Sequence, residues 1–245
     1  VHLAHDPAVP AAGIMPLVEV LDWGLREVSA LLGQARPDTL HVINPVDLDD
    51  YREQTGYEFH RLYARDGSRV VVEPAQVLFN RGLALHAAFH LATVWEVAHR
   101  VGGDDVLPRW FTEGLASYVA EDGMHFLSYL MMYRPDGAVV LTPAETEAIL
   151  AAPPHPDRET DKVRYRKAGY SAFLMMWELV EHRGGLERVL QLLDRVGAGE
   201  EVDAVCRDLW GHDLAGLAAD LDATTRPEPV GEAVAARPVH RPPSR

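Results

Sequence analysis

Two histidines four positions apart, His86 and His90, lie in the apolar stretch LALHAAFHLATVWEVAHR at residues 83–100. An α-helix turns 100° per residue, so the two side chains are about 40° apart on one face and one turn apart. Two imidazoles placed in this way can bind one metal ion, as in zinc sites built on a helix. Such pairs also occur by chance on helices, so a third ligand is needed to indicate a site.

The third ligand is expected on the next helix. A zinc ion with one coordination position left open needs three protein ligands. Glu113 lies in PRWFTEGLASYVAE (108–121), which follows the His pair after a Gly-Gly-Asp-Asp turn. Two helices joined by such a turn can fold back on one another. We therefore expect His86, His90 and Glu113 to bind one Zn²⁺ per chain, with a fourth position open in a cleft.

A second histidine-bearing segment, WEVAH at residues 95–99, follows in the same stretch. Trp95 and His99 face roughly half a circle away from the first pair, and Trp does not bind zinc. We interpret Trp95 as a packing residue, and Glu96 and His99 as a polar face of the helix.

The surrounding sequence predicts an α+β fold: a small mixed-sheet lobe, a central helix carrying the His pair, and a helical C-terminal lobe. Apolar periodicity predicts a helix over 16–32, ended by Gly33, and a long helix over 82–103. Strands are expected over 39–44 and 69–73, and over 57–63 as a third candidate.

The C-terminal half is strongly helical in pattern. Pro108 suits the first turn of a helix over 109–121, and Thr142 to Glu145 reads as a capping box. Further helices are expected over 163–185, 186–196, 200–210 and 213–223. We expect one folded domain over 1–222, with lobes at about 1–103 and 104–222. The Pro- and Arg-rich segment 223–245 is expected to be a disordered tail.

Composition narrows the functional classes. The chain has 245 residues, 47% of them hydrophobic, and a net charge of −14. That length supports one large domain or two closely packed lobes, and the acidic balance disfavours nucleic-acid and anionic-membrane binding. A single cysteine, Cys206, allows neither an intrachain disulfide nor a cysteine-based zinc site.

The sequence is compatible with more than one cellular compartment. No apolar run reaches the roughly 20 residues of a membrane span, so no membrane insertion is expected. The chain begins at Val1, and we therefore expect a processed or trimmed fragment. Both a cytoplasmic protein and a secreted one with its signal removed fit these observations.

Three segments together resemble the gluzincin zinc metallopeptidases, particularly the compact bacterial domains of the peptidase-MA-like type. They are RVVVEPA, RGLALHAAFHLAT and PRWFTEGLASYVAE. The family pattern is a strand, a Gly-Leu helix start, His-Glu-x-x-His and then Trp-x-x-Glu-Gly-x-Ala-x-Tyr. The likeness extends from about residue 16 to 222. It is specific at the Glu-Gly-Leu-Ala-Ser-Tyr run.

The resemblance implies a zincin-like fold with His86, His90 and Glu113 as zinc ligands. The spacing from His90 to Glu113 is longer than the family's, which predicts an extended active-site helix or loop. The resemblance also implies an oxyanion-stabilising hydroxyl from the C-terminal lobe, for which Tyr170 and Tyr165 are candidates; the alternative is that both pack between helices. The partner would be a peptide or small-molecule substrate. An extended peptide is expected along a sheet edge, with RVVVE as a candidate edge.

Ala87 is the departure from the family pattern, because it occupies the position of the general-base Glu. Losing a general acid–base typically costs about 10²–10⁴-fold in rate, so ordinary peptide hydrolysis should be impaired or absent. Ala87 is not a ligand position, so zinc binding need not suffer.

Three interpretations follow from Ala87. The chain is an ordinary zinc peptidase whose Glu was deliberately replaced, a natural pseudopeptidase that binds or regulates, or a zinc Lewis-acid enzyme of another reaction class. In the third case another residue would move protons. The candidates are Glu96, which helical geometry turns away from the His pair, and Glu121, Asp122 and His125.

Overall fold

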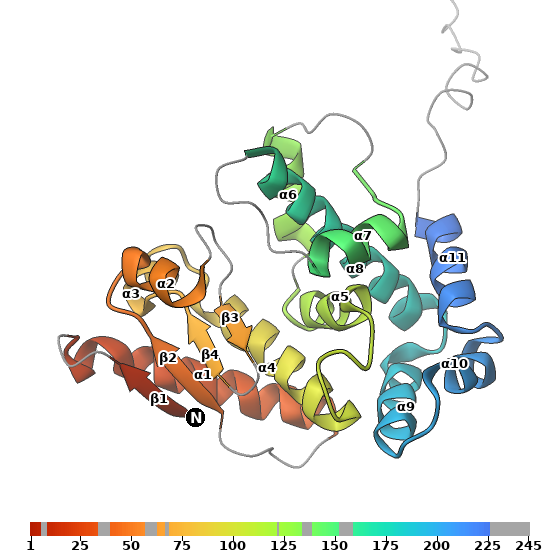
Figure 1. Cartoon of the computed structure of the whole chain (residues 1–245), viewed down its shortest axis with the longest axis horizontal. Helices are drawn as coiled ribbons and strands as arrows, with labels where there is room; N and C mark the ends of the chain where they lie inside the picture. Colours follow the sequence, from red (N-terminus) through yellow and green to blue (C-terminus); the bar gives the residue numbers. More distant parts are fainter. Residues whose placement is uncertain are drawn as a thin grey trace, which may run out of the picture.

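The chain folds into a four-stranded sheet and a set of helices, seen in a computed structural model (Figure 1). The structure describes residues 1–5, 9–33, 40–56, 63–66, 69–121, 123–133, 139–151 and 159–225. The strands are β1 (His2–His5), β2 (His41–Asn44), β3 (Tyr63–Asp66) and β4 (Arg69–Val72). The helices are α1 (Ala11–Leu31), α2 (Leu48–Thr55), α3 (Ala75–Asn80), α4 (Ala84–Val101), α5 (Arg109–Val119), α6 (Gly123–Tyr133), α7 (Pro143–Ala151), α8 (Glu159–His182), α9 (Gly185–Gly197), α10 (Val202–Trp210) and α11 (Leu214–Thr225).

The sheet has the order β1-β2-β4-β3. β1 and β4 both pair in parallel with β2, and β3 pairs antiparallel with β4, so the sheet is mixed as expected. The expectation that RVVVE forms a sheet edge is wrong, because β4 lies between β2 and β3. Its three valines are all buried, as suits an interior strand.

One face of the sheet packs against α1 and the first half of α4. Val42, Val70 and Val72 share a hydrophobic cluster with Leu21 of α1 and Leu91 of α4. On the other side, α2 contacts β4. Side chains alternate between the faces of a strand, so this cluster fixes which residues of β1 and β2 point away from α1 and α4.

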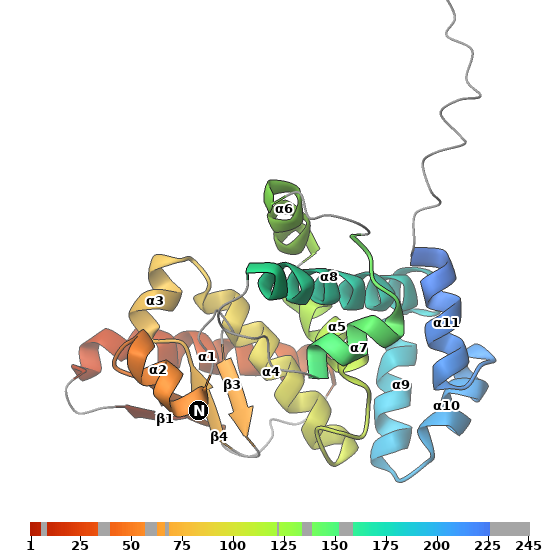
Figure 2. The same ribbon diagram turned by 45° about the horizontal axis from the view of Figure 1, so that its top comes forward.

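The helical lobe is organised around α8. Figure 2 shows α8 lying across α5, with α6 and α7 beside it, and α5, α6, α7, α9 and α11 all contact α8. Its core contains Phe111, Leu115, Met176 and Leu193, all buried.

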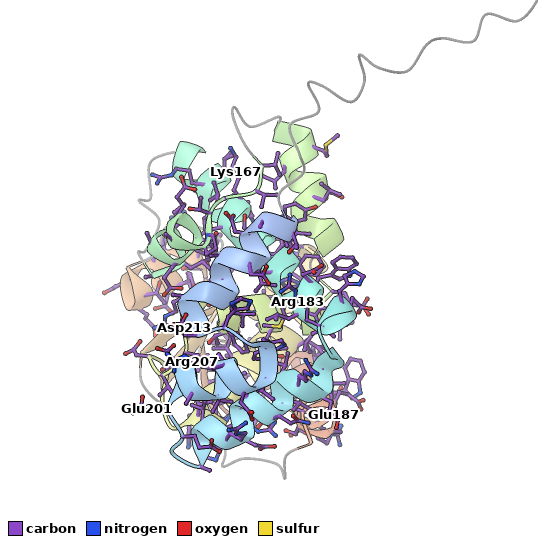
Figure 3. The ribbon with its side chains drawn as sticks, turned by 90° about the vertical axis from the view of Figure 1, so that its right-hand side faces the viewer. Lys167, Arg183, Glu187, Glu201, Arg207 and Asp213 are labelled. Atoms are coloured by element: carbon purple, nitrogen blue, oxygen red, sulfur yellow. The ribbon has the colours of Figure 1, made fainter. Side chains whose placement is uncertain are left out.

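Ion pairs join the last helices of this lobe, onto which Figure 3 looks. Arg183, at the end of α8, pairs with Glu178 and with Asp220 of α11. Arg207 Nη2, on α10, lies 3.5 Å from Oδ2 of Asp213, which directly precedes α11. These contacts connect α8, α10 and α11 at the end of the molecule farthest from the sheet (Figures 1 and 3).

The predicted α+β organisation is confirmed in its coarse form. The long predicted helices all occur, with shifted ends: α1 begins at Ala11 and contains Pro16, and α8 begins at Glu159. Of the candidate strand at 57–63, only Tyr63 is described, as the first residue of β3. The tail from 226 onward lies outside the described residues, and α11 continues to Thr225.

Four elements were not predicted: β1, α2, α3 and α6. The first three are short, and α2 is mostly polar. A signal for α2 was present, because the Asp47 side chain accepts hydrogen bonds from the backbone N–H groups of Asp49 and Asp50 and Gly56 ends the helix in the left-handed conformation. No described helix is both long and apolar enough to span a bilayer.

The capping box at α7 is confirmed. The Glu145 N–H donates to Thr142 Oγ1 at 3.1 Å, and the Thr142 N–H donates to Glu145 Oε2 at 2.9 Å. Each side chain therefore satisfies the other residue's backbone donor at the start of the helix.

Thr142→Ala should lower the free energy of unfolding by about 1 kcal/mol, because the Glu145 N–H loses its acceptor. Glu145→Gln is the matched control, since glutamine can also serve in a capping box and should cost less. Urea denaturation of the three proteins measures the difference. Equal stability of Thr142→Ala and the unaltered chain would contradict this role for the box.

Candidate metal centre

Helix α4 carries the candidate ligands and lies between the two hydrophobic clusters. Its first half, including Ala84 and Leu91, belongs to the cluster beneath the sheet. Its second half, including Val97 and Val101, belongs to the cluster of the helical lobe. α4 packs against α1, α5 and α9, so its orientation is fixed from several sides.

The structure brings His90 and Glu113 together, as the predicted helix–turn–helix requires. His90 Nε2 lies 3.5 Å from Glu113 Oε2, and their side chains are 11% and 22% exposed. Two ligands of one tetrahedral zinc ion, with bonds of about 2.1 Å, are about 3.4 Å apart. The observed separation therefore suits two ligands of one ion. It is equally that of a histidine–carboxylate ion pair.

His86 lies beside this pair, one turn earlier on α4. The rings of His86 and His90 have centroids 5.9 Å apart and are inclined by 33°. Over the described residues, however, no group of three or more His, Cys, Asp or Glu side chains is arranged to hold a metal ion. The donor types fit zinc, and two of the three donors have the separation that zinc needs. The His86 ring lies beside His90 but does not complete a three-ligand group with His90 and Glu113 within the described residues.

The long spacing between His90 and Glu113 is explained by α4 itself. The helix continues to Val101 and ends at Gly102, which adopts the left-handed conformation at φ 84°. Residues 103–108 then lead into α5. The structure therefore accounts for the spacing by the length of α4 and the residues that follow it.

Glu113 is held in place by the close packing of α5 on α8. A Cβ atom at Gly114 would lie 2.5 Å from the carbonyl oxygen of Ala172 and 3.3 Å from Met176 Cβ. Only glycine allows this approach. Gly114 directly follows the candidate ligand in the sequence, so the Glu-Gly pair was a visible signal for this role.

The start of α5 is stabilised from α7. The Trp110 N–H donates to Glu147 Oε2 at 3.0 Å, and Pro108 at the N-cap offers no side-chain acceptor. A carboxylate at a helix N-terminus satisfies an unpaired donor and interacts favourably with the helix dipole. This contact has no local signal in the sequence, because Glu147 is 37 positions from Trp110.

The start of α4 is fixed by an ion pair. Glu73, directly after β4, is fully buried, and Arg81 Nη1 lies 2.9 Å from its Oε2. Arg81 ends α3 two residues before the N-cap of α4. The pair therefore connects the sheet to the start of the helix that carries His86 and His90.

Ala87, which the resemblance aligns with the family's general-base Glu, is 1% exposed. It belongs to the hydrophobic cluster under the sheet together with Ala84, Ala88 and Leu91. A larger or charged side chain at 87 would have to be accommodated beside these residues. Alanine at this position is therefore compatible with the packing that surrounds it.

The two candidate tyrosines lie on different faces of α8. Ala172 faces α5 at Gly114, and helical geometry puts Tyr165 about 20° from that direction and Tyr170 about 160° from it. Tyr165 packs against the helical-lobe core. Tyr170 stacks on Phe173, with centroids 6.4 Å apart, and burial raises its pKa. Of the two, Tyr165 is thus on the side of α8 that faces the helix of Glu113.

Glu96 does turn away from the His pair, but it is not part of a polar surface. It is 1% exposed, accepts a hydrogen bond from Ser29 Oγ of α1, and its Oε2 has no hydrogen-bond partner within the described part of the chain. The polar-face expectation is wrong for Glu96 because α1 covers that side of α4. His99 is exposed as expected, and Trp95 packs against the core.

The other candidate bases have no shown link to the ligands. Glu121 is exposed beyond the end of α5 in the left-handed conformation at φ 58°, eight residues and about 12 Å of helix length from Glu113. Asp122 lies outside the described residues. For His125 the structure gives the backbone position on α6 but no side-chain placement.

Comparison with known proteins adds no family to this geometry: neither protein-family models, nor curated proteins, nor solved structures give a match to this chain. The interpretation of the site therefore depends on its residues and on the sequence resemblance described above.

Gly114→Ala should destabilise the protein by about 1–3 kcal/mol, because its methyl group would force α5 away from α8. Gly13→Ala in α1 is the matched control. A Cβ there meets nothing within 4 Å, so alanine should be neutral or stabilising by up to about 1 kcal/mol. Urea denaturation measures both, and similar effects of the two substitutions would show that the α5–α8 contact is not tight.

Glu96 should make stability depend on pH. Burial, the largest cause, raises its pKa above the ordinary 4.5, although Ser29, His99 and Arg100 oppose the rise. A raised folded-state pKa means that the contribution to stability is complete below pH 4.5 and is lost as pH rises through the folded-state value. Glu96→Gln should remove that loss and be more stable than the unaltered chain at pH 8.

Unfolding free energies measured in urea from pH 4.5 to 8 provide the comparison. Glu27→Gln is the control. Glu27 is exposed on α1, the helix that carries Ser29, and its replacement should leave the pH profile unchanged. If Glu96→Gln and the unaltered chain have parallel profiles, Glu96 is not the source of the dependence.

Proposed function

We propose that this chain is a zinc-binding protein of the metallopeptidase type, with peptide hydrolysis impaired by alanine at position 87. The observation that carries the proposal is the 3.5 Å separation of His90 Nε2 and Glu113 Oε2, from two successive helices, with His86 one turn away. His86, His90 and Glu113 would hold the ion. A zincin-like assignment of the fold is part of the same proposal.

When bound, zinc supplies a Lewis acid and a water of lowered pKa. The contribution of this chain is to hold donors of the right type on rigid helices: α4 is packed on several sides and α5 is held by α7 and α8. What the chain lacks is a carboxylate at 87 to move the proton. The missing carboxylate is expected to lower the rate of peptide hydrolysis by about 10²–10⁴-fold.

The substrate would be an extended peptide or a small molecule containing a carbonyl group. Since β4 is interior, the free edges of the described sheet are β1 and β3. A peptide could add to an edge strand by backbone hydrogen bonds. β3, antiparallel to its neighbour, is the edge that we propose for this role.

A non-proteolytic zinc protein is the second candidate, and the burial of Ala87 favours it. A methyl group at 87 completes the apolar cluster under the sheet, so the native packing does not need a carboxylate there. Such a protein would bind a peptide without cleaving it, or would use the metal in another carbonyl reaction.

Metal analysis is the first test. The purified protein should hold one zinc ion per chain at this centre, and both His86→Ala and Glu113→Ala should lose that ion. His99→Ala, on the exposed side of the same helix, is the control and should retain it. No zinc in the unaltered chain, and none taken up on addition, would rule out both candidate functions.

Restoring the carboxylate is the second test. Ala87→Glu should raise the rate of hydrolysis of an unstructured peptide by about 10²-fold or more over Ala87→Gln, which has the same bulk but no base. Both variants should lose some stability at this buried position. Equal, negligible rates with zinc still bound would favour the non-proteolytic protein.

A further inference from the structure

A second pair of histidines lies on the sheet, far in sequence from the candidate centre. His2 of β1 and His41 of β2 are direct partners in the parallel register. Their Nδ1 atoms are 3.4 Å apart, and their ring centroids are 5.1 Å apart with the planes inclined by 56°. Both residues are exposed.

The pair is on the opposite face of the sheet from the candidate centre's helix. Leu3 and Val42, the next residues along each strand, pack into the cluster with α1 and α4. Because side chains alternate across a strand, His2 and His41 point to the other side. Neither residue is therefore part of the site on α4.

The separation of the two nitrogens is that of two ligands on one tetrahedral ion. With metal–nitrogen bonds of about 2.0–2.1 Å, tetrahedral ligands are about 3.4 Å apart. Imidazole suits zinc, copper and nickel, and the register of the two paired strands places the two residues side by side. Water can complete the coordination, since the pair is exposed.

We propose that His2 and His41 form a second metal site, for a divalent transition-metal ion such as Zn²⁺, which clasps β1 to β2. β1 is an edge strand whose only partner in the described sheet is β2. The two ligands are 39 positions apart, so a bound ion closes a long loop and stabilises the folded state over the unfolded chain. The clasp does not depend on the proposed function.

The competing interpretation is a simple hydrogen bond between two neutral imidazoles, one ring donating to the other. Both arrangements bring the rings together, and they differ in their response to metal. A clasp makes the exchange of β1 amides depend on zinc. A hydrogen bond predicts no effect of zinc.

The test is titration of the full chain with Zn²⁺ at pH 7.5, followed by calorimetry and by hydrogen–deuterium exchange of residues 2–5 and 41–44. The unaltered chain should show a binding step that slows exchange in β1. His2→Gln and His41→Gln should each weaken that step by about tenfold or more, because a single ring loses the advantage of two held together. Glutamine is tolerated on a strand and is a poor zinc ligand.

His5→Gln is the matched control, since His5 is on the same strand and on its other face. It should leave the step and the protection unchanged. Loss of the step in only one of the two variants would mean that a single ring binds, which overturns the pair. Binding without slower exchange in β1, or titrations that neither substitution alters, would also overturn the proposal.

Discussion

The burial of α4 is the constraint on which the rest of the structure depends. This helix has apolar residues on almost every side, and it contributes its first half to one hydrophobic cluster and its second half to the other. Gly24 of α1 allows a close approach to it, because a Cβ there would lie 2.9 Å from Ala88 Cβ. This packing fixes the backbone of α4 relative to α5, and with it the position of His90 opposite Glu113.

The site follows from a small number of such contacts rather than from the ligand residues alone. Glu113 reaches His90 because Gly114 lets α5 lie directly on α8, and because Glu147 supports the first turn of α5. On the sheet side, the buried Glu73–Arg81 pair fixes where α4 begins. None of these residues is a candidate ligand, and each determines where one lies.

The sequence was informative where a signal is local. Helical spacing placed His86 and His90 on one helix, the Gly-Gly turn predicted the return of α5, and the capping box at Thr142 was correctly identified. It failed where the outcome depends on distant partners. The environment of Glu96 is set by Ser29 on α1, and the interior place of β4 is set by its pairing with both β2 and β3. Whether the His86 ring converges with the other two is likewise a matter of side-chain rotation rather than of spacing.

The order of the supporting helices along the chain has a consequence for synthesis. The His pair is on α4, while the contacts that place Glu113 come from α7 and α8, up to residue 176. During translation His86 and His90 therefore emerge well before the helices that position the carboxylate. A ribosome-bound chain ending before α8 would contain Glu113 but lack the helix on which α5 packs, so the arrangement of His90 and Glu113 becomes fixed only when most of the protein has been made.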